Sequence, residues 1–513
     1  MLEVIVDLRR RTASSASSLA ALGLAATLLV ACAVGPNFKP PPPPRDADSY
    51  LPADHALPEA TAAAPVAGGE TQRFVSPQDI PGQWWTLFQS PDLNGLIEEA
   101  LKHSPTLEAA QAALRQANEN VAAQRGAYFP SLTGTYQAQR ADASLTSFGL
   151  PGNGNYLYTL NSASVNVAYT LDVFGGIRRQ VEALQAQADY ERSSLEASYL
   201  ALTANVVTAA VTEASLRAQV AVTEEVARSQ RAQLDITQRR VTAGGASRVD
   251  VLQQQATLQA TLATLPALRT QLAQERDLLA TYVGTLPARY DGGAIQLDAL
   301  HLPQDLPVSL PSRLVEQRPD VREFSALLHE ATAQVGVATA NMLPQFTLTG
   351  AYGAASPKFS DLFTPSSAVW NLAGGITQTL FKGGQLVHQR RAAVAAAQQA
   401  AANYRATVLT AFQNVADSLL ALEGDAEVLA AQTGAEQSAA GSLQLVQAQY
   451  KAGGANYLQV LTAEQAYQNA TLALVKARAQ RFLDTAALFQ ALGGGWWNRS
   501  DAAASVSAAK GIS

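Results

Sequence analysis

The residue types that most often carry catalysis are scattered along this chain of 513 residues. The five histidines are His55, His103, His301, His329 and His388. They show no metal-ligand spacing, and none lies in a nucleophile motif. Neighbouring carboxylates such as Glu98 and Glu99 fit the solvated face of a helix. The sequence therefore predicts neither an enzyme nor a cofactor or metal site.

The only cysteine, Cys32, stands at the end of a segment typical of bacterial export. Three arginines at residues 9–11 precede an apolar run over residues 20–31, which indicates a signal peptide over residues 1–31. Residues 29–32 read Leu-Val-Ala-Cys and resemble the lipobox of bacterial lipoproteins, where the cysteine is acylated, with palmitate among the acids attached. A plain signal peptide with a chance cysteine, or a membrane helix, is the alternative, but the run is short for a spanning helix. Ala33 stands where an aspartate would favour the inner membrane, so the motif implies the outer membrane.

Composition narrows the class of protein further. The net charge of −6 offers no basic surface for nucleic acid, and 48% hydrophobic residues exclude a chain that is disordered throughout. Prolines at residues 40–44 and an Ala/Pro/Gly-rich stretch up to residue 69 predict an extended spacer.

Two long segments, residues 176–245 and 384–454, look like copies of each other and are predicted to be helices. The first runs from residue 177 to residue 242 without Pro or Gly, and the second contains no Pro. Apolar residues in the first follow steps of three and four, as in a coiled coil. A helix of this length measures about 100 Å at 1.5 Å per residue. A filament-like coiled coil would show the same pattern.

Proline pairs mark an internal duplication. Pro105 and Pro130 stand 25 residues apart, as do Pro319 and Pro344, and both long segments end in Ala-Gly-Gly. The landmarks recur with an offset of about 210 residues, which indicates a repeat. We therefore expect a spacer over residues 32–78, a first repeat over 79–295, a second repeat over 296–492 and a flexible tail over 493–513.

After the second proline of each pair, apolar and polar residues alternate, which predicts β-strands. The predicted strands are residues 132–139, 157–171, 346–352 and 370–380. Each repeat thus supplies one hairpin with an apolar and a polar face, which suits either a soluble sandwich or the wall of a membrane barrel. Four strands cannot close a barrel, but three chains would supply twelve. Since no run of 18 apolar residues follows the signal segment, strands rather than helices would cross a membrane.

Several short motifs occur in a fixed order along the chain. They are residues 32–38 (CAVGPNF), 84–85 (WW), 171–176 (LDVFGG), 249–252 (VDVL) and 492–496 (LGGGW). The ordered set resembles the TolC superfamily of outer-membrane efflux proteins, in its lipoprotein branch of the OprM/NodT type.

The resemblance implies a mainly α chain with four strands and two long helical hairpins. Three chains would form a twelve-stranded outer-membrane barrel continuous with a twelve-helix periplasmic tube. A belt around the tube would draw on residues 284–310 and 425–441 and on the carboxyl-terminal end.

The resemblance also implies a function. Such a homotrimer would be the outer-membrane channel of a tripartite efflux system, conducting small toxic compounds from a periplasmic adaptor and an inner-membrane pump of the resistance-nodulation-division type. The duct of a type I protein secretion system and a periplasmic coiled-coil lipoprotein without a pore are the alternatives.

The helix turns at residues 240–251 and 449–460 match the family's periplasmic tips, where the adaptor docks. The glycines should allow positive φ and a tight reversal, and the polar residues should cap the returning helices. The expected turn and cap residues are Gly244, Gly245, Ser247, Gly453, Gly454 and Asn456.

Pore-narrowing residues are expected beside these turns. In many relatives acidic residues just beyond the second turn narrow the pore, but here Gln459 and Thr462 stand at those positions, while Asp250 remains in the first turn. Tyr457 and Leu458 could add a steric or apolar constriction. We expect a closed tip with weaker cation selectivity.

Overall fold

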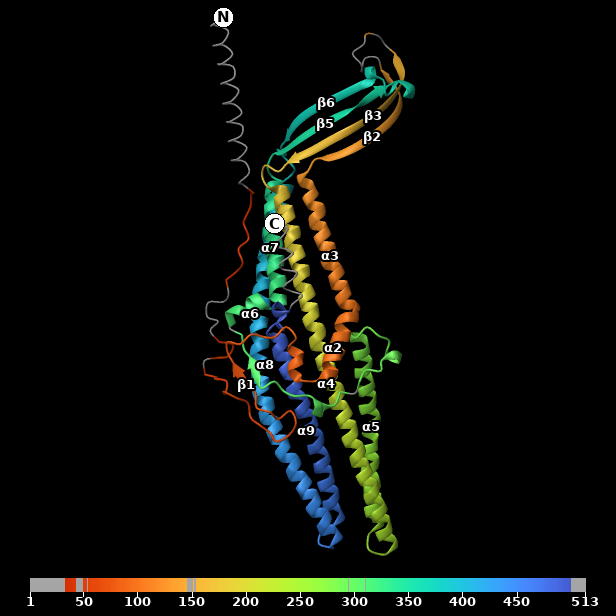
Figure 1. Cartoon of the computed structure of the whole chain (residues 1–513), viewed down its shortest axis with the longest axis vertical. Helices are drawn as coiled ribbons and strands as arrows, with labels where there is room; N and C mark the ends of the chain where they lie inside the picture. Colours follow the sequence, from red (N-terminus) through yellow and green to blue (C-terminus); the bar gives the residue numbers. More distant parts are fainter. Residues whose placement is uncertain are drawn as a thin grey trace. The chain divides into compact units, whose positions relative to one another are not determined.

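The chain is mostly helical in its computed structural model (Figure 1). The structure describes residues 33–42, 49–52, 54–144, 151, 154–293, 295–309 and 311–499. The chain forms two compact units. The first unit combines residues 1–40, 114–190 and 324–403, and the second combines residues 41–113, 191–323 and 404–513. Each unit draws on both sequence repeats, so the repeats are successive along the chain but are not separate bodies.

The two repeats contain the same elements in the same order. The first has α3 (Pro105–Arg125), β2 (Ser131–Ser144), β3 (Asn155–Leu171), α4 (Gly176–Thr242) and α5 (Arg248–Tyr282). The second has α7 (Pro319–Ala340), β5 (Gln345–Ser356), β6 (Ala368–Thr377), α8 (Gln385–Lys451) and α9 (Tyr457–Ala491). Both long helices have 67 residues, and both returning helices have 35. The predicted order of helices and strands is confirmed, although β6 ends at Thr377 rather than at residue 380.

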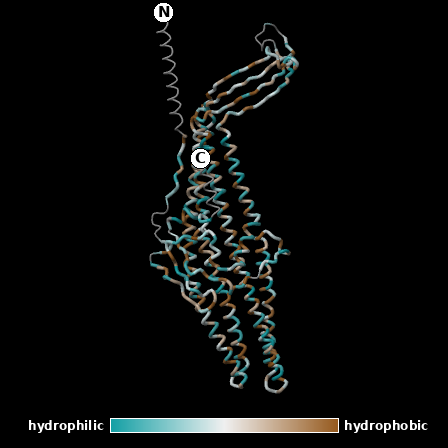
Figure 2. The backbone as a smooth tube through the Cα atoms, in the orientation of Figure 1, coloured by the Kyte–Doolittle hydropathy of each residue, from teal (hydrophilic) through white to brown (hydrophobic). Residues whose placement is uncertain are grey.

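The first unit contains an antiparallel sheet with strand order β2-β3-β5-β6 (Figure 1). The register aligns Gly134, Val165, Tyr352 and Trp370 across the four strands. Side chains alternate between the two faces along each strand. This row and the rows two residues away from it therefore form the apolar face, and the rows between them form the polar face. The alternation along the strands can be followed in Figure 2. Strands β2 and β6 lie at the two edges of the sheet.

The second unit also contains several short elements. They are β1 (Arg73–Val75), η1 (Trp84–Phe88), α2 (Pro91–His103), η4 (Pro287–Arg289), η5 (Leu297–Ala299), β4 (Asp305–Pro307), α6 (Pro311–Gln317) and η8 (Trp496–Asn498). Strand β1 pairs with β4 in parallel. Residues 425–441, expected in the belt, lie inside α8 as continuous helix. The first unit adds the turns η2 (Gly126–Tyr128), η6 (Phe359–Asp361) and η7 (Pro365–Ser367).

An aromatic core joins η1 to α9 within the second unit. Trp84 stacks on Phe489 with ring centroids 5.3 Å apart, and Phe88 lies 6.2 Å from Phe482. All four side chains are buried. Burial of such rings removes 150–250 Å² each from water, which makes this core a main source of stability.

The carboxyl-terminal segment is packed further than expected. The indole Nε1 of Trp496 donates to the carbonyl oxygen of Gln317 at 2.7 Å, and Arg499 lies 3.7 Å from the ring centre of Tyr199. The flexible tail predicted from residue 493 is therefore wrong for residues 493–499, because these aromatic and charged side chains bind neighbouring elements. The remainder of that tail lies outside the described residues.

Part of the expected spacer is likewise anchored. Arg481 on α9 is fully buried and donates to the carbonyl oxygens of Gly68 and Glu70, to Oγ1 of Thr61 and to Oε1 of Gln72. Hydrogen bonds to a charged donor contribute about 1.5–3 kcal/mol each. The packed part of the chain thus begins before residue 79, whereas the sequence predicted that it begins at residue 79.

Helix α4 bears on the expectation that no membrane-spanning helix follows the signal segment. Among the described residues, it alone is long and apolar enough to cross a membrane by length and composition, with an 18-residue window of mean hydropathy 1.2. Half of that window is buried inside the protein, as in the core helix of a folded domain.

Candidate functional site

The two turns between long and returning helices have the same backbone geometry. Gly244 and Gly453 have φ values of +78° and +83°. The N–H groups of Gly245 and Gly454 donate back to the carbonyl oxygens of Arg240 and Gln449, both at 2.8 Å. This six-to-one bond defines a Schellman ending, in which only the first glycine is left-handed. Positive φ is therefore confirmed for the first glycine of each pair and wrong for Gly245 and Gly454.

The predicted cap residues begin the returning helices. Ser247 accepts from the N–H of Val249 at 3.1 Å, and Asn456 accepts from the N–H of Gln459 at 3.0 Å. In return the Asp250 carboxylate and the Gln459 amide oxygen accept from the N–H groups of Ser247 and Asn456 at 2.9 and 2.8 Å. Both are reciprocal capping boxes. Asp250 and Gln459, singled out as pore candidates, thus also stabilise helix starts.

A chain of side-chain contacts links the two hairpins beside the turns. The guanidinium carbon of Arg240 on α4 lies 4.4 Å from the ring centre of Tyr450 on α8, and the rings of Tyr450 and Tyr457 are 5.6 Å apart. The hydroxyl of Tyr457 on α9 donates to Oε1 of Gln254 on α5. The Gln254 amide donates to the carbonyl oxygen of Gln230 on α4 at 3.0 Å. Four helices from both hairpins are therefore connected by cation–π, aromatic and hydrogen-bond contacts.

The structure separates the pore candidates into two groups. Tyr457 is 4% exposed and belongs to the contacts between the hairpins, whereas Leu458 is 61% exposed. Gln459 and Thr462 are also exposed, and together with Leu458 they occupy one outward face of the first turns of α9. Asp250 starts α5 on the other hairpin.

Sequence reasoning missed Glu464, which lies seven residues after Tyr457 on the same face of α9. Its side chain is 5% exposed. Burial raises the pKa of Glu464 to about 7, against the smaller lowering effect of the Gln254 and Gln447 amides. The spacing of seven residues from Tyr457 was the available signal for a shared face. We call Gln230, Gln254, Tyr457 and Glu464 the polar seam.

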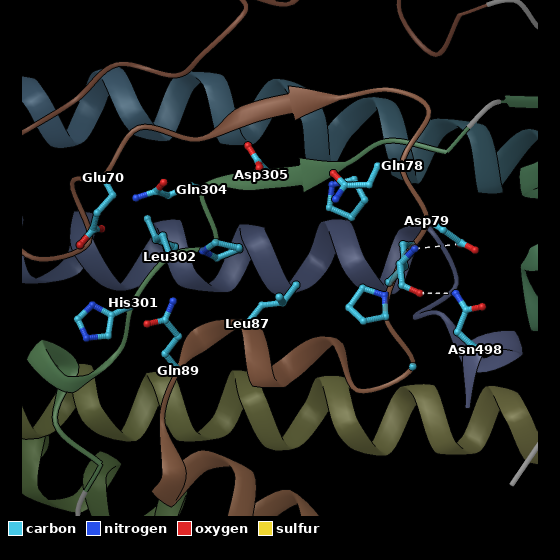
Figure 3. A pocket seen from close by; sticks show the side chains of 15 residues that line it. Glu70, Gln78, Asp79, Leu87, Gln89, His301, Leu302, Gln304, Asp305 and Asn498 are labelled. Atoms are coloured by element: carbon cyan, nitrogen blue, oxygen red, sulfur yellow. Dashed lines mark hydrogen bonds between the residues drawn. The ribbon is translucent and has the colours of Figure 1, made fainter. Parts of the chain in front are cut away.

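A cleft of about 920 Å³ lies elsewhere in the second unit (Figure 3). Glu70 and Asp79 lie towards its two ends, with Leu87 between them. Asp79 accepts from the indole N–H of Trp497 at 2.9 Å, and Asp305 pairs with Arg73. None of the predicted site residues lines this cleft, and two of its three carboxylates are already used by the fold.

In the part of the chain that the structure describes, no group of three or more His, Cys, Asp or Glu residues could hold a metal ion. Cys32, the predicted lipid attachment site, lies outside the described residues.

Comparison with known proteins agrees with this architecture. Residues 96–285 and 310–494 match the family described as outer membrane efflux protein. The chain is 30% identical over 469 residues to the probable efflux pump outer membrane protein TtgC of Pseudomonas putida, which covers 89% of this chain and 96% of that protein. It is 28% identical over 483 residues to the outer membrane protein OprJ of Pseudomonas aeruginosa, covering 92% and 95%.

Solved structures show the same fold. The outer-membrane channel OprN aligns with a TM-score of 0.80 at 26% identity, over 91% of this chain and all of that one. The CmeC outer membrane channel of Campylobacter jejuni aligns with a TM-score of 0.82 at 20% identity, over 93% and 98%.

This chain therefore belongs to the outer membrane efflux protein family and to the TolC superfamily of channels. Its function is that of the outer-membrane channel in a tripartite efflux system, as the sequence predicted. A coiled-coil lipoprotein without a pore does not agree with membership of this channel family.

Proposed function

We propose that three copies of this chain close into a twelve-stranded outer-membrane barrel that continues into a twelve-helix periplasmic tube. The register of the sheet is the observation that carries this proposal. It places apolar side chains in rows across all four strands, while β2 and β6 remain as edges. An exposed edge invites pairing with another strand, and a cyclic trimer pairs β6 of each chain with β2 of the next.

The exposed side chains of the sheet support a lipid environment. Tyr352 is 68% exposed, Trp370 75% and Leu372 78%, and all three share the apolar face. Large contiguous apolar patches are rare on soluble proteins, whereas an outward apolar band with aromatic residues is typical of outer-membrane barrels.

The turns of the helix hairpins form the docking surface for a periplasmic adaptor in this proposal. The docking surface consists of the two turns around Gly244, Gly245, Ser247 and Gly453, Gly454, Asn456. The adaptor connects the channel to an inner-membrane pump of the resistance-nodulation-division type, and the system exports small toxic compounds. Relatives are named for efflux pumps and for a cation efflux system, which supports this class of partner.

The exposed face of α9 narrows the pore in this proposal. Leu458, Gln459 and Thr462 line the constriction, Asp250 adds a carboxylate from the other hairpin, and Tyr457 holds the hairpins together behind them. With one acidic residue per chain, cation preference is weak, and Asp250→Asn should abolish what remains. Planar bilayer recordings test this: a strong cation preference that survives Asp250→Asn would contradict it.

Lipid attachment at Cys32 completes the proposed arrangement, with the chain anchored in the outer membrane and extending into the periplasm. The signal segment and the lipobox-like residues 29–32 support it.

Cysteine cross-linking tests the trimer. Thr135 on β2 lies on the polar face, as do the odd-numbered β6 residues Asn371 and Ala373. Chains carrying Thr135→Cys with Asn371→Cys or Ala373→Cys should form disulfides between copies and run as linked oligomers without reductant. Thr135→Cys with Leu372→Cys is the matched control, because Leu372 points to the other face. Monomers only, in every pair, would overturn the closed barrel.

A further inference from the structure

Within the first unit, the segment that follows the proposed lipid attachment site packs directly against α4, α7 and the residues before α4. The N–H of Val34 donates to the carbonyl oxygen of Phe174 at 3.1 Å. A Cβ placed on Gly175 would lie 2.6 Å from Ala33, and one on Gly35 would lie 2.5 Å from the Cα of Gly336. Backbone therefore touches backbone on both sides of the segment, which only glycine permits. We call residues 33–38 the seated segment.

Arg179 on α4 is the centre of this contact. Its Nε donates to the carbonyl oxygen of Val34 at 3.1 Å, and Nη2 donates to the carbonyl oxygen of Gly35 at 3.4 Å and to Oδ1 of Asn37 at 2.6 Å. Nη1 donates to Glu182 at 2.7 Å. The Arg179 side chain is only 3% exposed. A buried guanidinium that directs three of its bonds to one peptide fixes that peptide in position, since an unpaired partner would carry the full desolvation cost.

A second contact holds the end of the seated segment. The ring of Phe38 stacks on His329 of α7 with centroids 4.3 Å apart and an angle of 13° between the planes. His329 Nε2 lies 3.0 Å from Glu182 Oε1, so the same glutamate joins the Arg179 contact to the Phe38 contact. Two helices, α4 and α7, therefore hold the segment from both sides.

The seat lies where the sheet ends and helix α4 begins. Phe174, which receives the Val34 hydrogen bond, lies 6.3 Å from Phe346 at the start of β5. At this end of the sheet large apolar side chains face outward: Ile376 is 70% exposed, and Leu380 and Phe381, which follow β6, are 92% and 88% exposed. Apolar and aromatic girdles mark the membrane interface of outer-membrane barrels.

We propose that Arg179 is a positioning residue for a lipid anchor: with Gly35, Gly336 and His329 it fixes the seated segment so that acyl chains on Cys32 enter the membrane beside the sheet's helix-side end. Cys32 directly precedes Ala33, the first residue of the seated segment, in the sequence. Arg179 recognises two backbone carbonyl oxygens and the Asn37 side chain of the chain's own amino-terminal peptide, and the partner of the anchor is the inner leaflet of the outer membrane. The inference rests on the proposed acylation of Cys32.

A double-mutant cycle separates positioning from ordinary stabilisation. Arg179→Ala is placed in the full chain and in a chain with Cys32→Ser behind a signal peptide cleaved without acylation. The readout is the fraction of outer-membrane protein that migrates as an oligomer in unheated gel samples. We expect Arg179→Ala to lower this fraction about fivefold in the acylated chain and less than about twofold in the chain without acyl groups.

Other variants keep the test informative if Arg179→Ala does not fold. Asn37→Ala removes only the 2.6 Å bond, and Gly35→Ala displaces the segment by steric contact; both should show the same dependence on acylation. Arg391→Ala is the matched control, because Arg391 is an exposed arginine on α8 in the same unit, so its effect should be equal in both chains.

Mass spectrometry of the amino-terminal peptide distinguishes the two ways of failing. An acylated Cys32 with equal effects of Arg179→Ala in both chains would overturn the positioning role and leave the lipid anchor standing. A wild-type chain without acyl groups on Cys32 would overturn both.

Discussion

Replacing Glu464 with Gln tests whether ionisation of this carboxyl weakens the packing of the two hairpins. Burial raises its pKa from 4.5 to about 7, so the closed polar seam binds the proton more tightly than an opened, hydrated one. For an acid with a raised pKa, the cost to the closed state is absent below about pH 4.5, grows as the pH rises and is complete above about pH 7. The hairpins should therefore separate more easily in neutral than in acidic medium.

The size of this effect follows from the shift. The difference between 4.5 and about 7 is about 2.5 units and corresponds to roughly 3–4 kcal/mol per chain, at about 1.4 kcal/mol for each pH unit. Because the side chain is only 5% exposed, solvent screens little of it. Glu464→Gln keeps the shape and removes the charge, so at pH 8 it should stabilise the closed seam by up to that amount, about 300-fold in the opening equilibrium.

Hydrogen exchange of α5 and α9 amides measures this opening. At pH 8 the Gln variant should exchange up to about 300-fold more slowly than wild type, and at pH 4.5 the two should agree within about twofold, since intrinsic exchange rates cancel at matched pH. Glu427→Gln, on the exposed side of α8, is the matched control and should change neither value. Equal protection of wild type and Glu464→Gln at pH 8 would refute the reasoning.

Two further substitutions probe other parts of the fold. Arg481→Ala removes four hydrogen bonds, three of them to buried acceptors, and should lower the free energy of unfolding by about 3–5 kcal/mol in denaturant titrations. The exposed Arg231→Ala should lower it by less than about 0.5 kcal/mol, and equal midpoints for the two would show that the Arg481 contacts contribute nothing. Because the φ of Gly453 is +83°, Gly453→Ala should lower the free energy of unfolding by about 1 kcal/mol and weaken binding of the adaptor. The neighbouring Gly454→Ala should change the free energy of unfolding very little. A larger loss of stability for Gly454→Ala than for Gly453→Ala would contradict the observed turn geometry.

Local patterns along the chain were sufficient to predict the main elements. The spacing of apolar residues by three and four predicted α4, and the alternation of apolar and polar residues predicted the four strands. The polar residues after each Gly-Gly pair predicted the capping residues Ser247 and Asn456. These features depend on neighbours in sequence. The choice of the first glycine as the left-handed one also has a local cause, the Schellman bond, but it requires knowing the last helical residue to within one position.

Features that depend on distant contacts were not predictable in the same way. The seven-residue spacing puts Glu464 on the same helix face as Tyr457, but it does not show that this face is buried until α5 packs against α9. Arg481 fits an exposed helix position equally well until residues 61–72 lie over it, and the seated segment needs two glycines 301 residues apart, Gly35 and Gly336. In each case the physical cause is a partner whose sequence position carries no periodic signal.

Accumulation of a fluorescent cationic dye tests the central claim, that this chain conducts small compounds out of the cell. Cells lacking the chain should accumulate more dye than wild-type cells, and restoring the wild-type gene should bring accumulation back down. Equal accumulation with and without the chain, when the restored protein is present in the outer membrane, would contradict small-molecule efflux and favour the secretion of polypeptides.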